Sequence, residues 1–469
     1  MEAHSSPTEI LNLSNLASIN LIVNSPNTAD KSAGSISRRF LTKAMAETEK
    51  KSIVVIGGGI IGSTTAYFLT RHPKYDPSKH SIHLIEATSI ASGASGKAGG
   101  LLALWAYPSC LVPLSFKLHA ELAKEHGGTD RWGYRGVGVG QIDLVGRQVR
   151  NQPKITTNGQ SKTEDIRGLH RPDVSSDGNV SLQKRSKESY SSLRKMGLPD
   201  DLDWVAEDCV QGYDSMGSPR DTAQVHPFQF TTSMAALAEE KGAKVIIGSV
   251  DKIESSSSGE HTVRYTDKET NSQKSLPATD VIVTAGPWTK TVWPGSPIGA
   301  LRAHSVTIRP SHPVSAYCLF TQLALPKNFK EGVKSRSMHV SPEIYARPNN
   351  ELYACGEGDH LVPLPKSSAE VEVDDSRCQD IVDYCASFSD EMRDGEVLVR
   401  QACYLPQVET GAGPLVGHTN TKGVYLAAGH TCWGIQNGPA TGKLMSEFIF
   451  DGKPLSGNIS SLDPRRALR

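Results

Sequence analysis

The sequence has no excess of charge of one sign. Its 469 residues carry 50 Lys and Arg against 50 Asp and Glu, so the formal net charge is zero. A protein that binds nucleic acid or an acidic membrane surface through charge needs a basic patch. The composition therefore predicts no nucleic-acid partner and favours a protein that handles small molecules.

Cysteine is scarce and scattered. The eight cysteines include no C-x-x-C pair, and no group of Cys and His has the spacing of a zinc site. The sequence therefore predicts no metal site. Free thiols in a reducing compartment are the expected state of these cysteines.

A secretory signal and a transmembrane segment are also lacking. The uncharged run 52–70 approaches membrane length, but three consecutive glycines interrupt it. The segment 1–50 is rich in Ser and Asn with few acids, and we interpret it as a disordered extension or a targeting segment. We predict a cytoplasmic protein, or a mitochondrial one if 1–45 is a transit segment.

A glycine-rich turn follows the first predicted strand. Residues 53–56 are apolar and β-branched, which is typical of a strand buried on both faces. Gly57, Gly59 and Gly62 then have the spacing G-x-G-x-x-G. This spacing permits a tight turn and lets a pyrophosphate approach the backbone. The next helix, expected over 60–71, would point its free N–H groups at phosphate.

An acidic residue at the end of the next predicted strand strengthens this interpretation. Glu86 closes the strand 81–86, where its carboxylate would accept hydrogen bonds from both ribose hydroxyls of an adenosine. The segment 92–102 is rich in Gly, Ala and Ser, which suits a backbone that lies against a flat ligand. Within it, Lys97 is either a cation near that ligand or a solvated surface lysine. The order of these elements predicts dinucleotide binding.

Two further turns follow predicted strands late in the chain. The strand 280–284 leads into residues 285–288, Ala-Gly-Pro-Trp, a bend at the sheet edge where α/β folds bind ligands. The strand 423–428 leads into the glycine turn and helix of 429–442. A second helix N-terminus suits a flavin, because reduction leaves negative charge along N1 and C2=O of the ring. A dehydrogenase that uses a soluble nicotinamide has no such need.

Between residues 297 and 406, strand-like runs become short and separated. We interpret this region as a mostly antiparallel sheet inserted between parts of the first domain. The predicted fold class is α/β, a Rossmann-like cofactor domain with an inserted, mostly antiparallel α+β substrate domain. Its expected ranges are 1–50 for the extension, 51–130, 221–296 and 411–455 for the cofactor domain, and 131–220 with 297–410 for the substrate domain.

Smaller elements complete the predicted organisation. The polar segment 146–184 has almost no apolar periodicity, and we interpret it as a surface insertion that could bind a protein partner. We expect helices over 187–196 and 380–392, and short strands around 203–205. Pro439 is expected near the start of the last helix.

Four motifs in order carry a family resemblance: Ile53–Gly62, Ala94–Leu102, Val281–Trp288 and Gly429–Gly442. With them, the region from Ile53 to Phe450 resembles the D-amino-acid-oxidase-type FAD-dependent oxidoreductases. The similarity is greatest on the glycine and sarcosine oxidase side, and two of the motifs look like a fungal branch of the family.

The resemblance implies non-covalently bound FAD and oxidation of a small amine or amino-acid-like substrate. In such relatives a carbon bearing an amine gives a hydride to flavin N5, and molecular oxygen reoxidises the flavin. The residues that would bind the cofactor, with Val250 contacting adenine through its backbone, are Gly57, Gly59, Ile60, Ile61, Gly62, Glu86, Ala87, Lys97, Gly99, Gly100, Leu101, Val250, Ala285, Gly286, Gly429, His430, Gly434 and Ile435.

The substrate side departs from the family pattern. Amino-acid-oxidising relatives often carry an arginine before a proline to clamp the substrate carboxylate, and Leu405 stands at the corresponding place here. Arg347 could supply the clamp from another strand, or be a charge at a strand end. The other catalytic candidates are Tyr345, which strands also commonly bury, and His430, which could bond the ring or substrate or serve only in packing.

The sequence leaves alternatives for flavin attachment and for the class of function. Cys403 raises the hypothesis of a covalent flavin, against the alternative of a buried free thiol. Leu405 and the polar insertion 146–184 leave a second class of function open, an FAD-binding regulatory or scaffold protein with little turnover. FAD chemistry on a C–O bond is a third reading, because fold does not fix substrate.

Overall fold

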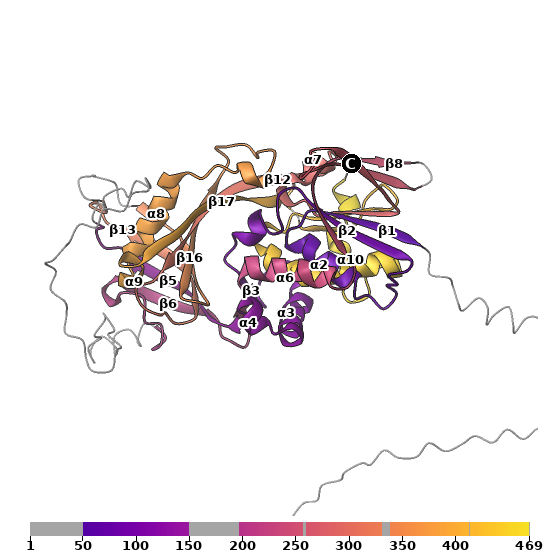
Figure 1. The fold of residues 1–469 in the computed structure, drawn as a ribbon. Helices are drawn as coiled ribbons and strands as arrows, with labels where there is room; N and C mark the ends of the chain where they lie inside the picture. The colour runs from indigo at the N-terminus through magenta and orange to yellow at the C-terminus, as the bar shows by residue number, and fades with distance from the viewer. Residues whose placement is uncertain (1–49, 150–196, 257–258, 331–337, 412, 469) are drawn as a thin grey trace, which may run out of the picture. The chain divides into compact units, whose positions relative to one another are not determined.

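A mixed sheet with a parallel centre forms one half of the fold (Figure 1). The computed structural model describes residues 50–149, 197–256, 259–330, 338–411 and 413–468. The sheet has the strand order β10-β9-β8-β2-β1-β11-β19-β18, and the neighbours from β8 to β19 pair in parallel. These strands are β1 (Lys51–Ile56), β2 (His80–Glu86), β8 (Lys244–Ser255), β9 (His261–Asp267), β10 (Gln273–Ala278), β11 (Asp280–Val283), β18 (Leu415–His418) and β19 (Val424–Ala428).

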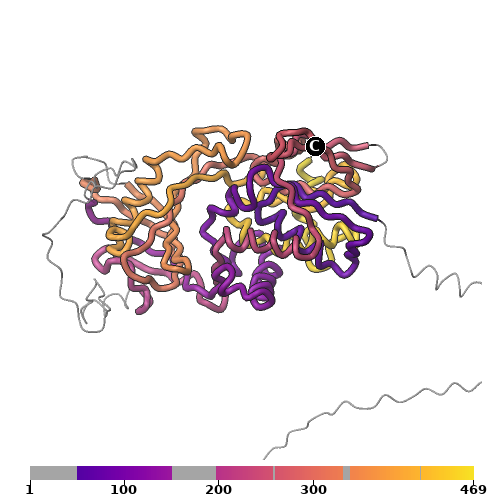
Figure 2. The backbone as a smooth tube through the Cα atoms, in the orientation of Figure 1, coloured from indigo at the N-terminus to yellow at the C-terminus, as the bar shows by residue number. Residues whose placement is uncertain are grey.

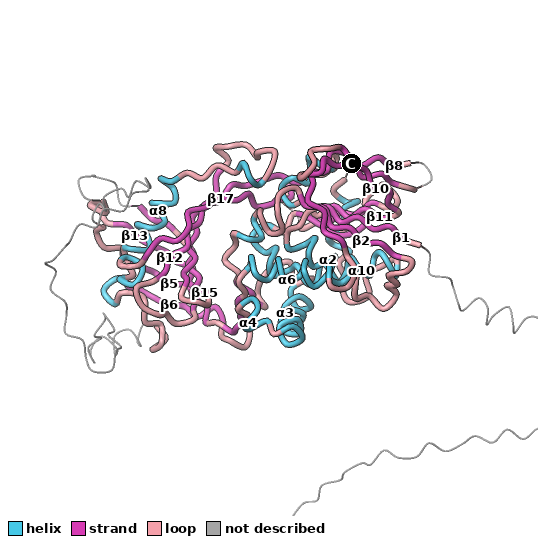
Figure 3. Tube along the Cα trace, viewed as in Figure 1, coloured by secondary structure: helices cyan, strands magenta, loops and turns pink. Residues whose placement is uncertain are grey.

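Helices cover this sheet, and two of them from opposite ends of the sequence pack together (Figures 2 and 3). An added Cβ at Gly442 would lie 2.5 Å from the Thr64 carbonyl carbon, so only glycine permits this close crossing. The Thr64 hydroxyl also donates to the Gly438 carbonyl at 2.9 Å. The helices of this half are α2 (Ile60–Leu69), α3 (Val112–His126), α4 (Gly128–Trp132), α6 (Pro227–Glu239), α7 (Thr289–Val292) and α10 (Gly434–Asp451).

A second eight-stranded sheet has the order β17-β12-β16-β15-β13-β5-β6, with β14 beside β13. All its pairings are antiparallel except that of β13 with β5, which agrees with the predicted mostly antiparallel sheet. Helices α8 (Asp375–Ala386) and α9 (Asp390–Arg393) belong to this half. The strands are β5 (Gly138–Val145), β6 (Val210–Gly217), β12 (Ile298–Arg309), β13 (Tyr317–Leu325), β14 (Met338–Val340), β15 (Glu343–Arg347), β16 (Glu351–Asp359) and β17 (Glu396–Val408).

A small third sheet has the order β3-β7-β4. Its strands are β3 (Leu101–Ala103), β7 (Thr222–Gln224) and β4 (Arg135–Gly136). The pairing of β3 with β7 fixes the end of the small-residue loop that follows β2. The division into domains at the predicted residue numbers stays a proposal.

Several local predictions were wrong. The helix expected over 380–392 is two helices, because Ser389 interrupts it and caps α9 by accepting the Met392 N–H at 3.3 Å. Residues 203–205 form no strand, although Trp204 is fully buried in the core of the second half. Pro439 lies inside α10 rather than near its start. The predicted helix 187–196, the extension 1–49 and the insertion from residue 150 onward lie outside the described residues.

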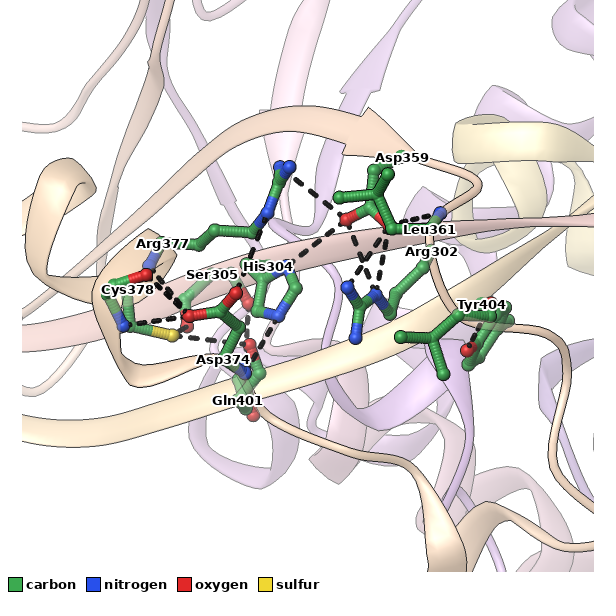
Figure 4. Close-up of polar contacts among 12 residues, drawn as sticks. Arg302, His304, Ser305, Asp359, Leu361, Asp374, Arg377, Cys378, Gln401 and Tyr404 are labelled. Carbon is green, nitrogen blue, oxygen red and sulfur yellow. Dashed lines mark hydrogen bonds and ion pairs between the residues drawn. The ribbon is translucent and has the colours of Figure 1, made fainter.

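A buried ion pair joins β12 to β16 (Figure 4). Arg302 Nη2 lies 3.1 Å from Asp359 Oδ1, and both side chains are less than a tenth exposed. Asp359 also accepts the Leu361 N–H at 2.9 Å, and Arg377 Nη1 lies 3.5 Å from it. Burial opposes ionisation of Asp359, but the Leu361 N–H and Arg302 outweigh it and hold the pKa of this carboxyl below its usual range.

Breaking this pair is expected to destabilise the protein strongly. Asp359→Asn leaves the buried Arg302 without its counter-charge, so stability should fall by about 3–5 kcal/mol. The control is Glu396→Gln. Glu396 is the exposed partner of Arg309, which lies on β12 as Arg302 does, and its loss should change stability by less than about 1 kcal/mol. Urea unfolding followed by circular dichroism measures both variants. Equal losses would contradict this account of the buried pair.

Candidate functional site

A cavity of about 450 Å³ lies where the parallel strands of the first sheet end. Ile56, Glu86 and Ala428, at the carboxyl ends of β1, β2 and β19, line it. Residues of β12, β13, β15, β16 and β17 in the second sheet line its other side. Ligands of open α/β sheets bind at this edge, and the volume is that of a small-molecule site.

The first glycine turn lies at one part of this cavity. Gly57 has φ +109°, and an added Cβ there would lie 2.6 Å from the Thr284 carbonyl oxygen. A Cβ on Gly62 would lie 1.9 Å from the Gly57 carbonyl oxygen, so α2 packs directly against the turn. Gly59 is the N-cap of α2 and provides no side-chain cap. The Ser95 hydroxyl accepts the Ile60 N–H at 2.9 Å, so a side chain from the loop after β2 caps this first helical N–H. Gly59, Ile60 and Ile61 line the cavity, so the start of α2 forms part of its wall.

Glu86 lies beside this turn and supports it. Its carboxylate accepts the Gly58 N–H at 2.7 Å and the Thr88 N–H at 2.9 Å. The Thr88 hydroxyl in turn contacts that of Ser368, at 2.6 Å, from the segment after β16. Its Oε1 also accepts the Thr88 hydroxyl at 3.0 Å and lies 3.5 Å from the Ser92 hydroxyl oxygen. A carboxylate has about four acceptor positions, so it is Oε2, which accepts the Gly58 N–H, that keeps one for a hydroxyl of a ribose.

The last glycine turn lies at another part of the cavity, ahead of α10. His430 is buried, and its Nε2 lies 3.0 Å from the Thr441 hydroxyl oxygen. Burial lowers the pKa of His430 to about 3, so the ring is neutral at physiological pH. Gly434 and Ile435 at the start of α10 also line the cavity. A neutral histidine and a helix N-terminus suit a ring that gains negative charge on reduction.

Side chains of the second sheet hold the loop at Ala98 and Gly99, which directly precedes β3. A Cβ on Gly99 would lie 2.3 Å from the Tyr345 ring, so the ring packs directly against the glycine backbone. Arg347 donates to the Ala98 and Gly99 carbonyls, the latter at 3.5 Å, and to Glu351 at 2.6 Å. The geometry makes Arg347 a positioning residue for this loop.

Every residue predicted for cofactor binding or catalysis lines the cavity except Gly62 and Arg347. Gly62 lies behind the turn, while the guanidinium of Arg347 bonds the loop backbone rather than facing the cavity. None of the described lining residues is an arginine, and Leu405 does line the cavity. The hypothesis of an Arg347 carboxylate clamp therefore gains no support from this arrangement.

Sequence reasoning missed a group of lining residues on the second sheet. They are Phe320, Glu343, Tyr353 and Cys355, with Lys366 and Ser368 from the segment after β16. Residues two apart in a strand share a face, so the place of Tyr345 in a strand could have pointed to Glu343. The strand pairing that adds Tyr353 and Cys355 is tertiary information.

Two negative findings concern the described residues alone. No helix among them is long and apolar enough to cross a membrane. No three His, Cys, Asp or Glu side chains in these ranges are grouped so that they could hold a metal ion. All eight cysteines are free.

The donor set fits an extended dinucleotide that carries a flat ring. The first glycine turn and the start of α2 line the cavity, Glu86 offers a carboxylate oxygen, and Gly99 and Gly429 place backbone without a side chain at the cavity wall. An added Cβ at Gly429 would lie 2.6 Å from Val408, so this turn too requires glycine. FAD fits this cavity better than a mononucleotide does. The Gly57 turn and Glu86 suit its adenosine and pyrophosphate, and the separate turn at Gly429 suits its flat ring.

Comparison with solved structures agrees with the fold. The crystal structure of glycine oxidase from Geobacillus kaustophilus has a TM-score of 0.59 at 19% identity, covering 89% of this chain and 99% of that one. L-proline dehydrogenase from P. horikoshii has a TM-score of 0.60 at 16% identity, covering 89% and 98%. At these identities the likeness establishes the fold.

Sequence comparison establishes the family. The Saccharomyces cerevisiae protein TDA3 is 36% identical over 504 aligned positions, which cover 89% of this chain and 94% of TDA3. Glycine oxidase of Geobacillus kaustophilus is 22% identical over 429 positions, covering 87% and 97%. A family model described as "DAO: FAD dependent oxidoreductase" matches residues 52–448. The chain therefore belongs to the DAO family of FAD-dependent oxidoreductases.

Proposed function

We propose that this oxidoreductase oxidises a C–N bond of an amine or amino-acid-like substrate, with molecular oxygen as the electron acceptor. One observation carries the proposal: a single cavity joins the dinucleotide-binding turn, the turn ahead of α10 and a compartment walled by the second sheet. A substrate in that compartment would lie over the flavin ring. The names of the two structural neighbours, glycine oxidase and L-proline dehydrogenase, agree with C–N chemistry.

The cofactor would supply the hydride acceptor, and the chain would supply orientation and electrostatics. Backbone N–H groups at Gly434 and Ile435, together with the dipole of α10, would stabilise negative charge on the ring. Tyr345 would fix the Gly99 backbone at the ring. His430 would act as a neutral hydrogen-bonding group, because its low pKa keeps it unprotonated.

An anaerobic reduction experiment tests this function. Oxidised, purified holoprotein is mixed without oxygen with simple amines, N-methyl amino acids and D-amino acids. At least one donor is expected to bleach the yellow flavin band, and admission of oxygen should restore the band with release of hydrogen peroxide. Flavin that stays oxidised with every donor would favour the scaffold reading. If the flavin bleaches but oxygen reoxidises it only slowly, the physiological electron acceptor is a molecule other than oxygen.

Non-covalent attachment gives a separate prediction. Cys403 lines the cavity, but burial raises the pKa of its thiol to about 11, which leaves little of the nucleophilic thiolate. Acid-precipitated protein should therefore release its yellow colour into the supernatant. Flavin that remains in the pellet of wild-type protein, and leaves it in Cys403→Ser, would show a covalent bond to this cysteine.

A further inference from the structure

The substrate side of the cavity carries a carboxylate where amino-acid-oxidising relatives often carry a cation. Glu343 on β15 lines the cavity, and its Oε2 accepts the Tyr345 hydroxyl. Cys355 Sγ lies 4.0 Å from the same oxygen. Both contacts come from neutral donors, and none of the described cationic side chains forms an ion pair with Glu343. The Glu343 carboxylate is therefore available to a cationic group bound in the cavity.

The groups in contact with Glu343 are neutral, so they do not compensate its charge. Burial raises the pKa of the Tyr345 hydroxyl and of the Cys355 thiol above their usual values. Burial also raises the pKa of Glu343 itself, since the ionised form loses hydration. A cation bound beside it would reverse this effect and stabilise the carboxylate.

Aromatic rings surround this carboxylate. The Tyr345 ring lies 5.7 Å from that of Tyr353 and 6.2 Å from that of Phe320, measured between centroids, and all three line the cavity. Trp433 lines it from the turn ahead of α10, and Trp105 links Trp433 to Phe320. The faces of such rings attract cations, above all alkylated ammonium groups. Tyr353 already has the Arg347 guanidinium carbon 4.8 Å from its ring centroid.

Neither of the two lysines that line the cavity is a counter-ion for a substrate carboxylate. Lys97 donates to the Ala402 carbonyl at 2.9 Å, and burial lowers its pKa. Lys366 is exposed and lies two residues from Ser368, whose hydroxyl contacts that of Thr88 next to Glu86. Neither takes the place of an arginine in the clamp position, which Leu405 occupies.

We propose that Glu343 is the counter-ion of the ammonium group of the incoming substrate, an amine recognised without a carboxylate clamp, and that this carboxylate takes the ammonium proton before the carbon gives its hydride. The proposal deepens the proposed function and rests on it for the flavin's position. It makes Glu343 a specificity-determining residue, with Phe320 and Tyr345 as the apolar surround of the cation.

Ligand binding to the oxidised holoprotein tests this proposal without turnover. The probes are benzyltrimethylammonium, a permanent cation, and phenylacetate, a carboxylate of similar size. Each is titrated while the flavin absorbance spectrum is recorded. The cation should perturb the spectrum and bind at least about tenfold more tightly than phenylacetate, because the buried charge selects its opposite. Tighter binding of phenylacetate, or no effect of the cation, would overturn the proposal.

Matched variants locate the effect. Glu343→Gln should weaken the cation at least about tenfold, since it removes the counter-charge. Glu343→Asp should keep part of the affinity, which separates loss of charge from loss of fold. The control Glu357→Gln removes the same charge from an exposed site on the neighbouring strand and should bind as wild type does.

Cation binding that is unchanged in Glu343→Gln, with normal flavin content, would contradict this role of Glu343. The anaerobic donor screen is scored separately. Selective cation binding without flavin reduction by any donor would therefore remove the proposed reaction and leave the binding assignment standing.

Discussion

Replacing Gly62 with alanine is expected to lower the affinity for FAD by about 10–100-fold, because overpacking of this kind costs about 1–3 kcal/mol. The added Cβ would lie 1.9 Å from the Gly57 carbonyl oxygen and 2.7 Å from the Thr284 hydroxyl oxygen. The first of these is a backbone atom of the turn itself, so the turn has to open. Flavin content per chain and FAD titration of the stripped protein measure the loss.

The control for this substitution is Gly295→Ala. No heavy atom lies within 4 Å of a Cβ at Gly295, and its φ is ordinary. The same chemical change there should leave flavin content at the wild-type level. Full FAD content in the Gly62 variant would show that the close packing of α2 on the turn is not needed to hold the FAD pyrophosphate.

Replacing Arg347 with methionine is expected to have the second large effect. The guanidinium is buried, and its loss leaves Glu351 and the Ala98 and Gly99 carbonyls without their donor. Removal of one partner of such a buried network costs about 3–5 kcal/mol. The loop beside the ring should loosen, so FAD binds more weakly and the flavin spectrum changes before any substrate is added.

The clamp hypothesis for Arg347 predicts a different result. A residue that only held a substrate carboxylate would leave the flavin spectrum and content unchanged, and would raise KM for carboxylate substrates alone. Arg309→Met, at an exposed position on β12, serves as the control for loss of an arginine. A wild-type spectrum in the Arg347 variant would restore the clamp hypothesis.

The first half of the fold could be predicted from the sequence because its signals are local. The apolar runs of β1 and β11 mark strands buried on both faces, and each is followed by a glycine-containing bend. Parallel strands place all their carboxyl ends at one edge, so finding the turns was enough to bring them together. The lining of the cavity by Gly57, Glu86 and Gly429 follows from that geometry.

The second half was less predictable because its site residues depend on strand pairing. Glu343 and Arg347 lie on the same strand, yet one lines the cavity while the other bonds the loop backbone at Ala98. The spacing of the two residues cannot tell these positions apart. Side chains alternate between the faces of a strand, so residues four apart lie on the same face. Similarly, Ser389 ends a predicted helix by capping the next one, a local competition that apolar periodicity does not report.

The most direct test of C–N oxidation is anaerobic reduction of the flavin by an amine and by its α-deuterated form. The account predicts that the amine bleaches the flavin and that deuterium at the carbon bearing nitrogen slows bleaching, because that C–H bond breaks in the step. Selective reduction by alcohols or hydroxy acids, or an oxidised flavin with every amine and amino acid, would contradict it.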